Sequence, residues 1–219
     1  MTARPGGFRA VLFDFGGVIS ESPFVAFRQF EQERGLPEGF LQRVNRSNPD
    51  DNAWARFERS ELAPDAFDAA FEAETRAAGH AVRGLDVIDL IYGPIRPQMI
   101  RAVRRCREHF LTACLTNNFA RAERRGLDRV PGRAQEWAEA LALFDAVVES
   151  SKVGARKPEQ RYFELACRQL GVAPREAVFL DDLGANLKPA RDMGMHTIKV
   201  NEPDAALAEL EQVLAVPLR

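Results

Sequence analysis

The chain has 219 residues, 46% of them hydrophobic, which suits one substantial globular core with room for a smaller inserted unit. Its formal net charge is −2, so no global positive field favours nucleic acid as a partner. Cys106, Cys114 and Cys167 form no C-x-x-C pair, which argues against a disulfide framework or a zinc knuckle and favours a reducing compartment. The N-terminus lacks the apolar core of a signal peptide, and no apolar run approaches the roughly 20 residues of a membrane span. We therefore expect a cytoplasmic protein with no membrane span.

Short apolar runs, partly β-branched, predict strands that are buried on both faces. They are Ala10–Phe13, Thr112–Thr116, Asp145–Ser150, Ala177–Asp182 and Thr197–Val200. Amphipathic stretches that predict helices precede the second, fourth and fifth of these strands, at Pro97–His109, Pro158–Leu170 and Asn186–Met193. Because strands alternate with helices, the expected fold class is α/β, with a doubly wound parallel sheet.

Residues 20–95 show a different pattern, because helical stretches follow one another there with no convincing strand between them. The predicted helices are Pro23–Arg34, Gly39–Asn45, Asn52–Arg59 and Pro64–Gly79. This segment is rich in aromatic residues, namely Phe24, Phe27, Phe30, Phe40, Trp54, Phe57, Phe67 and Phe71. They either build a small core of the insert or, for a few of them, line a cavity over an active site.

Polar residues gather where the predicted strands end. The first strand runs into Asp14 within VLFDFGGVI, the second into Thr116-Asn117-Asn118, and the fourth into Asp181-Asp182. The third leads into the loop SSKVGARKP, which contains Lys157. Ligands of open parallel sheets bind beyond the carboxyl ends of the strands, so we expect these groups to converge at one edge. Singly, each could be a helix cap, a turn residue or a surface lysine.

This set of groups suits phosphoryl transfer through a covalent aspartyl intermediate. Carboxylates on adjacent loops suit Mg²⁺, and the metal and a lysine together would neutralise a substrate phosphate so that a carboxylate could attack it. Thr116 and nearby backbone N–H groups would hold the remaining phosphate oxygens. Gly16 and Gly17 would let the backbone approach the metal and phosphate with no Cβ in the way.

Four segments resemble, in order, the signatures of the haloacid dehalogenase superfamily, most of whose members are Mg²⁺-dependent phosphatases. They are FDFGGV, LTNN, GARKP and FLDDLGANLKPARDMGM. Within that superfamily, the chain is similar to the N-terminal phosphatase domain of soluble epoxide hydrolase and to the hydrolase-like segment of multidomain acyl-CoA dehydrogenase proteins. The resemblance implies a Rossmann-like catalytic core of residues 1–19 and 96–219, with a helical cap domain of residues 20–95 inserted after the first strand.

The resemblance also implies a role for each site residue. Asp14 would be the nucleophile and a metal ligand, and the backbone carbonyl of Gly16 a second ligand. Asp182 would be the second metal carboxylate, with Asp181 at the metal or just outside its ligand shell. The remaining residues would support phosphate and loop: Thr116 and Asn117 would bind phosphate, Lys157 would pair with Asp14 and the phosphate, and Asn186 would support the loop.

Gly16 is a departure from the superfamily pattern, because an acid two residues after the nucleophile usually protonates the leaving group and then activates water. General acid–base catalysis is worth roughly 10²–10⁴-fold, so its loss predicts a slow phosphatase acting on a small phosphorylated substrate. Glu21 or Asp50 could replace the missing acid, although nothing in the sequence singles out either one. Two alternatives stay open: a module that binds a phosphorylated ligand or a protein, and a metal-independent 2-haloacid dehalogenase. The sequence does not indicate the oligomeric state.

Overall fold

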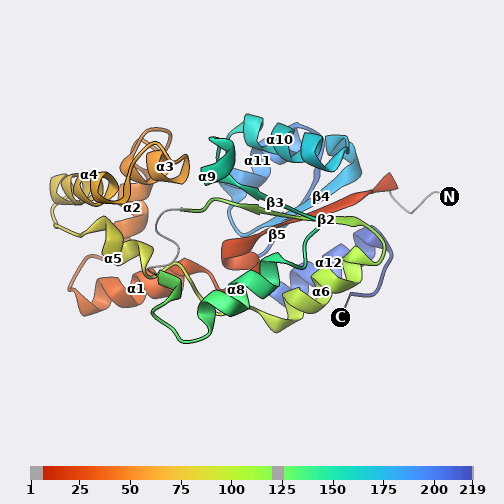
Figure 1. The fold of residues 1–219 in the computed structure, drawn as a ribbon, viewed down its shortest axis with the longest axis horizontal. Helices are drawn as coiled ribbons and strands as arrows, with labels where there is room; N and C mark the ends of the chain where they lie inside the picture. Colours follow the sequence, from red (N-terminus) through yellow and green to blue (C-terminus); the bar gives the residue numbers. More distant parts are fainter. Residues whose placement is uncertain (1–6, 120–125, 219) are drawn as a thin grey trace.

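The computed structural model describes residues 7–119 and 126–218, and its centre is a sheet of five parallel strands (Figure 1). In spatial order the strands are β3, β2, β1, β4 and β5. Their bounds are β1 Ala10–Asp14, β2 Leu111–Thr116, β3 Ala146–Glu149, β4 Ala177–Asp181 and β5 His196–Lys199. The predicted α/β class and parallel sheet are confirmed. The first six residues, on which the absence of a signal peptide partly depended, lie outside the described residues.

The central strand, β1, is buried along its whole length. It pairs with β2 on one side and with β4 on the other, so Ala10 lies opposite both Leu111 and Ala177. The β1–β4 pairing ends with Phe13 opposite Leu180. The next residue of each strand is an aspartate, so this register brings Asp14 and Asp181 to the same edge of the sheet.

Helices cover both faces of the sheet (Figure 1). On one face, α6 (Pro97–Arg107), α12 (Pro203–Leu214) and α8 (Arg133–Leu141) pack against buried strand residues such as Val11 and Phe13. On the other face, α10 (Gln160–Leu170) and α11 (Gly184–Asp192) pack against Leu12 and Phe179. The alternation of Val11, Leu12 and Phe13 between two cores explains why the strand reads as an unbroken apolar run.

Five helices between β1 and α6 form a separate cluster beside the sheet, here called the helical insert (Figure 1). They are α1 Pro23–Glu33, α2 Phe40–Arg46, α3 Ala53–Glu58, α4 Pro64–Ala77 and α5 Gly84–Ile88. Most of the aromatic residues noted in the sequence are buried in a core that belongs mainly to this insert. Phe24, Phe27 and Trp54 also line a cavity, so both readings of the aromatic residues hold, each for part of the set.

The chain enters and leaves the helical insert at neighbouring points. A short π-helical turn, η2 (Phe15–Ile19), leads from β1 to Ser20, and Ser20 forms an isolated antiparallel bridge with Ile95. The Glu21 N–H also donates to the Pro94 carbonyl at 2.9 Å. These contacts therefore hold the two ends of the helical insert together. None of the described helices has the length and apolar character needed to cross a membrane.

The described chain also contains two short helices that connect larger elements. Helix α9 (Ser150–Val153) follows β3 directly and precedes the loop that contains Lys157. The 3₁₀ turn η3 (Pro174–Glu176) leads into β4. Both belong to the crossover connection that joins the parallel strands β3 and β4.

Candidate active site

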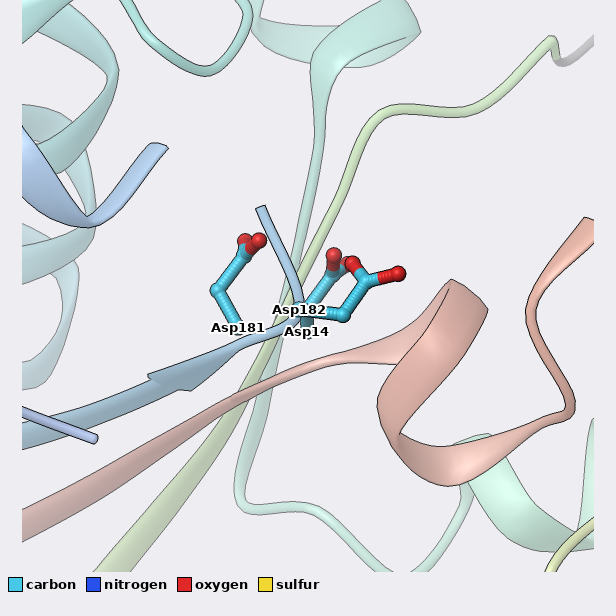
Figure 2. Close-up of side chains that lie close together, drawn as sticks. All are labelled: Asp14, Asp181 and Asp182. Atoms are coloured by element: carbon cyan, nitrogen blue, oxygen red, sulfur yellow. The ribbon is translucent and has the colours of Figure 1, made fainter. Parts of the chain in front are cut away.

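Three carboxylates meet at the carboxyl ends of the adjacent strands β1 and β4 (Figure 2). Asp14 ends β1, Asp181 ends β4, and Asp182 is the next residue. One oxygen from each carboxylate lies within 4.8 Å of the others. Asp14 and Asp181 are buried, whereas Asp182 is partly exposed. The structure therefore brings together the three acids that the sequence places at this edge.

A buried lysine connects two of these acids. The Nζ of Lys157 lies 2.6 Å from Oδ1 of Asp14 and 3.0 Å from Oδ2 of Asp181. Its side chain is only 1% exposed. The loop that contains it is held by Asn117, whose Oδ1 accepts from the Lys157 N–H at 2.9 Å and whose Nδ2 donates to the Lys157 carbonyl at 3.0 Å. Because both backbone groups are held, the ammonium has a defined position between the carboxylates.

The charges of the cluster do not balance, because three carboxylates face one ammonium. Burial raises the pKa of Asp14 well above its usual value, and the Lys157 ammonium opposes this shift. Burial alone would lower the pKa of Lys157, but attraction to Asp14 and Asp181 outweighs it and raises that pKa. Burial, followed by repulsion from Asp181, raises the pKa of Asp182 from 3.8 to about 6. An excess of buried negative charge is the condition that a divalent cation relieves.

The adjacent acids Asp181 and Asp182 have different surroundings. The carboxylate of Asp181 accepts from the Leu183 N–H at 2.8 Å and from Nδ2 of Asn186 at 3.1 and 3.0 Å. Asp182 has a long contact, 3.4 Å, from the Ser22 hydroxyl of the loop before α1. Asp181 is thus committed to contacts within the protein, while Asp182 keeps more of its oxygen lone pairs for another ligand.

The two glycines after Asp14 differ in what their surroundings require. Gly17 has a φ of +84°, and a Cβ added there would lie 2.2 Å from Oδ2 of Asp182. A side chain at position 17 would therefore displace Asp182. Gly16 has an ordinary φ of −70°, and a Cβ there would meet nothing within 4 Å. The absence of an acid at position 16 is therefore not imposed by lack of space.

The site opens into a cavity of about 440 Å³ between the sheet edge and the helical insert. Thr116 and Asn117 contribute to its wall, as does Asn186. Among the described residues, three carboxylates line it: Asp14, Asp182 and Glu58. Glu21 and Asp50, the two acids weighed as replacements for the one missing at position 16, are not among its lining residues.

Glu58 is a site residue that the sequence did not identify. It ends α3, its side chain is only 7% exposed, and it pairs with the guanidinium of Arg156. No strand end or glycine turn precedes it, and it reads as one polar position on an amphipathic helix. Its burial against the loops that contain Asn117 and Arg156 is a property of how the insert packs on the sheet.

The residues at this edge fit a magnesium ion. The ligands Mg²⁺ prefers are oxygens, with one or two carboxylates and several waters retained. Asp14 and Asp182 provide carboxylate oxygens beside a cavity, and the cluster has an uncompensated negative charge. No described histidine or cysteine takes part in this group of acids, so the donor set is that of a hard cation.

A family model for haloacid dehalogenase-like hydrolases matches residues 8–194. The chain therefore belongs to the haloacid dehalogenase-like hydrolase family, and the resemblance seen in the sequence is confirmed. It is 35% identical over 96% of its length to acyl-CoA dehydrogenase family member 10 of Mus musculus, and 33% identical over 96% to bifunctional epoxide hydrolase 2 of Sus scrofa. It spans only 20% and 39% of these relatives' lengths.

A third relative is similar over almost all of both chains. It is the sesquiterpene phosphatase astK of Aspergillus oryzae, 23% identical over 94% of this chain and 97% of that protein. Phosphatases are thus among the homologues of this hydrolase.

Solved structures share the fold. A family enzyme of Bacteroides thetaiotaomicron, an Asp-to-Ala mutant in complex with magnesium and inorganic phosphate, has a TM-score of 0.60 at 17% identity, covering 88% of this chain and 93% of that one. A dehalogenase with an intermediate complex has a TM-score of 0.66 at 20% identity, covering 95% and 98%. At these identities the likeness shows the fold alone.

Proposed function

We propose that this hydrolase is a Mg²⁺-dependent phosphatase that cleaves phosphomonoesters through an aspartyl-phosphate on Asp14. The observation that carries the proposal is the buried contact of 2.6 Å between Asp14 and Lys157, beside two further carboxylates, of which Asp182 lines the cavity together with Asp14. Residues 1–19 and 96–219 form the catalytic core in this proposal, and residues 20–95 form its cap. The bridge between Ser20 and Ile95, which joins the two ends of the insert, supports these boundaries.

In the first step, a carboxylate oxygen of Asp14 attacks phosphorus, and the bond to the leaving alcohol oxygen breaks. Lys157 holds Asp14 in position and offsets negative charge on the phosphoryl group. Thr116 and the backbone N–H groups beside it hold phosphate oxygens. When bound by Asp14, Asp182 and the Gly16 carbonyl, with Asp181 beside them, the metal supplies positive charge that stabilises the transferring phosphoryl group.

In the second step, water attacks phosphorus and the bond to Asp14 breaks, which restores the carboxylate and releases inorganic phosphate. Gly16 provides no side chain to protonate the alcohol in the first step or to accept a proton from water in the second. The chain therefore favours substrates whose leaving oxygen needs little protonation. The rate is low for simple alkyl phosphates, by the roughly 10²–10⁴-fold that acid–base catalysis contributes.

The cavity wall supports a substrate whose organic part is apolar. On the insert side it includes Phe24, Phe27 and Trp54, and on the sheet side Phe119 and Trp137. Aromatic side chains present large apolar surfaces whose burial by a ligand is favourable. We expect aryl or long-chain alkyl phosphates to have lower KM values than sugar phosphates of similar size.

The test is phosphate release from p-nitrophenyl phosphate and acetyl phosphate, with Mg²⁺ and with EDTA. Both substrates have good leaving groups, so the lack of an acid at position 16 matters least for them. We expect turnover that requires Mg²⁺ and is lost in Asp14→Asn. A folded wild-type protein that binds Mg²⁺ but gives no turnover above Asp14→Asn would overturn the proposal in favour of a binding module. Metal-independent halide release from a 2-haloacid would instead identify a dehalogenase.

A further inference from the structure

Hydrogen bonds connect Glu58 of the helical insert to Lys157, although the two residues are far apart in the sequence. Its Oε2 accepts from Nδ2 of Asn117 at 3.2 Å. The same amide holds both backbone groups of Lys157, at 2.9 and 3.0 Å. The ammonium of Lys157 in turn contacts Asp14 at 2.6 Å. A continuous series of contacts therefore runs from the insert to the nucleophile.

The carboxylate of Glu58 is itself fixed by three donors. Oε1 accepts from the Trp54 indole N–H at 3.0 Å, and Oε2 accepts from Nε of Arg156 as well as from Asn117. A carboxylate has about four lone-pair sites, so three of them are occupied. The backbone carbonyl of Glu58 also accepts from the Ser150 hydroxyl at 2.8 Å, which anchors the end of α3 to the start of α9. Glu58 is rigidly held and acts as an acceptor throughout.

Glu58 adds a third hydrogen bond to the two that Lys157 makes with the Asn117 amide, whose two orientations exchange acceptor and donor. An Asn side chain has one acceptor and two donor hydrogens. In the observed orientation Oδ1 faces the Lys157 N–H, and the two Nδ2 hydrogens face the Lys157 carbonyl and Glu58. A carboxylate accepts and does not donate, so Glu58 favours the orientation in which Nδ2 points toward it. In the flipped orientation the Lys157 N–H would face a donor.

We infer that Glu58 is a positioning residue for the reaction: it orients the Asn117 amide, and that amide fixes Lys157 against Asp14. The inference rests on the proposed phosphatase function for its kinetic consequences, but not for its structural ones. Seating of the helical insert on the sheet and placement of the catalytic lysine then become one event. An insert displaced from the sheet removes one of the three hydrogen bonds on the Asn117 amide, so Asn117, and with it Lys157, is less well held.

The kinetic test compares Glu58→Gln with the wild type on p-nitrophenyl phosphate and on an alkyl phosphate. We expect kcat to fall roughly 10–100-fold, as for other residues that hold catalytic groups in place, with a smaller change in KM. The factor is the same for both substrates, because Lys157 acts on the phosphoryl group in either case. A loss confined to the alkyl phosphate would assign proton transfer to Glu58 and overturn the positioning role.

Matched variants separate an effect of Glu58 that acts through Asn117 from a general loss of packing. Glu31→Gln removes another buried glutamate of the insert, which accepts from the N–H groups of Gly39 and Leu41 and does not line the cavity. We expect its kcat to equal that of the wild type. In an Asn117→Ala background, Glu58→Gln costs no further factor in kcat, whereas full additivity would refute action through Asn117.

A second measurement does not depend on turnover. In ¹⁵N-labelled protein, Glu58→Gln shifts the backbone amide resonance of Lys157, although Glu58 does not contact that group, and Glu31→Gln leaves it in place. An unchanged Lys157 amide would overturn the inference. If the wild type shows no phosphatase activity, the proposed function fails, while this amide still reports on the coupling. If Glu58→Gln does not fold, the same Lys157 amide measurement is made on Trp54→Phe, which removes one donor to Glu58.

Discussion

Replacing Asp182 with asparagine should stabilise the metal-free protein, although it removes a proposed metal ligand. Burial and the neighbouring Asp181 raise the pKa of Asp182 from 3.8 to about 6. The folded state therefore binds the proton more tightly than the unfolded state does, and ionisation at neutral pH favours unfolding. This rise of the pKa from 3.8 to about 6 corresponds to about 3 kcal/mol once the carboxyl group is fully ionised.

The pH dependence has a definite sign. The penalty is absent below about pH 4, grows as the pH rises toward 6 and is complete above it, so this group makes the folded state less stable with rising pH. At pH 5 the gain from Asp182→Asn falls to about half its value at pH 7.5. For a chain of this size, 1 kcal/mol changes Tm by about 2–4 °C, so the variant should melt about 6–12 °C above the wild type in EDTA.

Calorimetry at pH 7.5 and pH 5, with EDTA and with Mg²⁺, measures this. Asp50→Asn is the control, because it removes the same charge from an exposed position outside the cavity. Mg²⁺ at 100 times its Kd should stabilise the wild type by about 2.7 kcal/mol and the Asp182 variant by less. The reasoning fails if Asp182→Asn melts at or below the wild type at pH 7.5 in EDTA, or if its advantage does not shrink at pH 5.

Three further substitutions test other parts of the site. Gly16→Asp enters open space and should raise kcat for alkyl phosphates by roughly 10²–10⁴-fold, and much less for aryl phosphates; equal effects on both would contradict the missing-acid explanation. Gly17→Ala places a methyl against Asp182 and should weaken Mg²⁺ binding in titration calorimetry, so an unchanged Kd would show that the contact is unimportant. Lys157→Met leaves two buried carboxylates without their ammonium and should lower the free energy of unfolding by about 3–5 kcal/mol at pH 8 in urea titrations. The loss should be smaller at pH 5, where protonation of Asp14, whose pKa is raised by burial, relieves the repulsion between the two carboxylates. A loss independent of pH would argue against a charge effect.

The sheet and its polar edge were predictable because each strand is a short apolar run that ends in an unusual residue. Asp14, Lys157 and Asp181 were each placed at a strand end or in the loop that follows one, and parallel strands necessarily bring such ends together. Helices α8 and α12 were not anticipated. Their periodicity was present, but neither adjoined a residue that drew attention to it.

The details that depend on packing between distant segments were beyond the sequence. Nothing in Asp181-Asp182 indicates which acid is bound by Asn186 and which remains available, because the difference lies in the direction of each side chain. Glu58 was missed for the same reason: its neighbours in the chain describe an ordinary amphipathic helix, and two of its three partners, Asn117 and Arg156, lie about 60 and 100 residues away. Contacts of that kind are set by the seating of the helical insert.

The central place of β1 in the sheet has a consequence for the order in which the protein can be made. Asp14 leaves the ribosome before its neighbour across the sheet, Asp181, which is 167 residues later. At synthesis rates of about 5–20 residues per second, the first strand waits roughly 8–33 s for β4. During that interval the helices of the insert are already complete and can bury their aromatic core, while one edge of β1 stays unpaired. The nascent chain therefore exposes a strongly apolar strand edge until β4 has been made, and such an edge is the kind of surface that chaperones recognise.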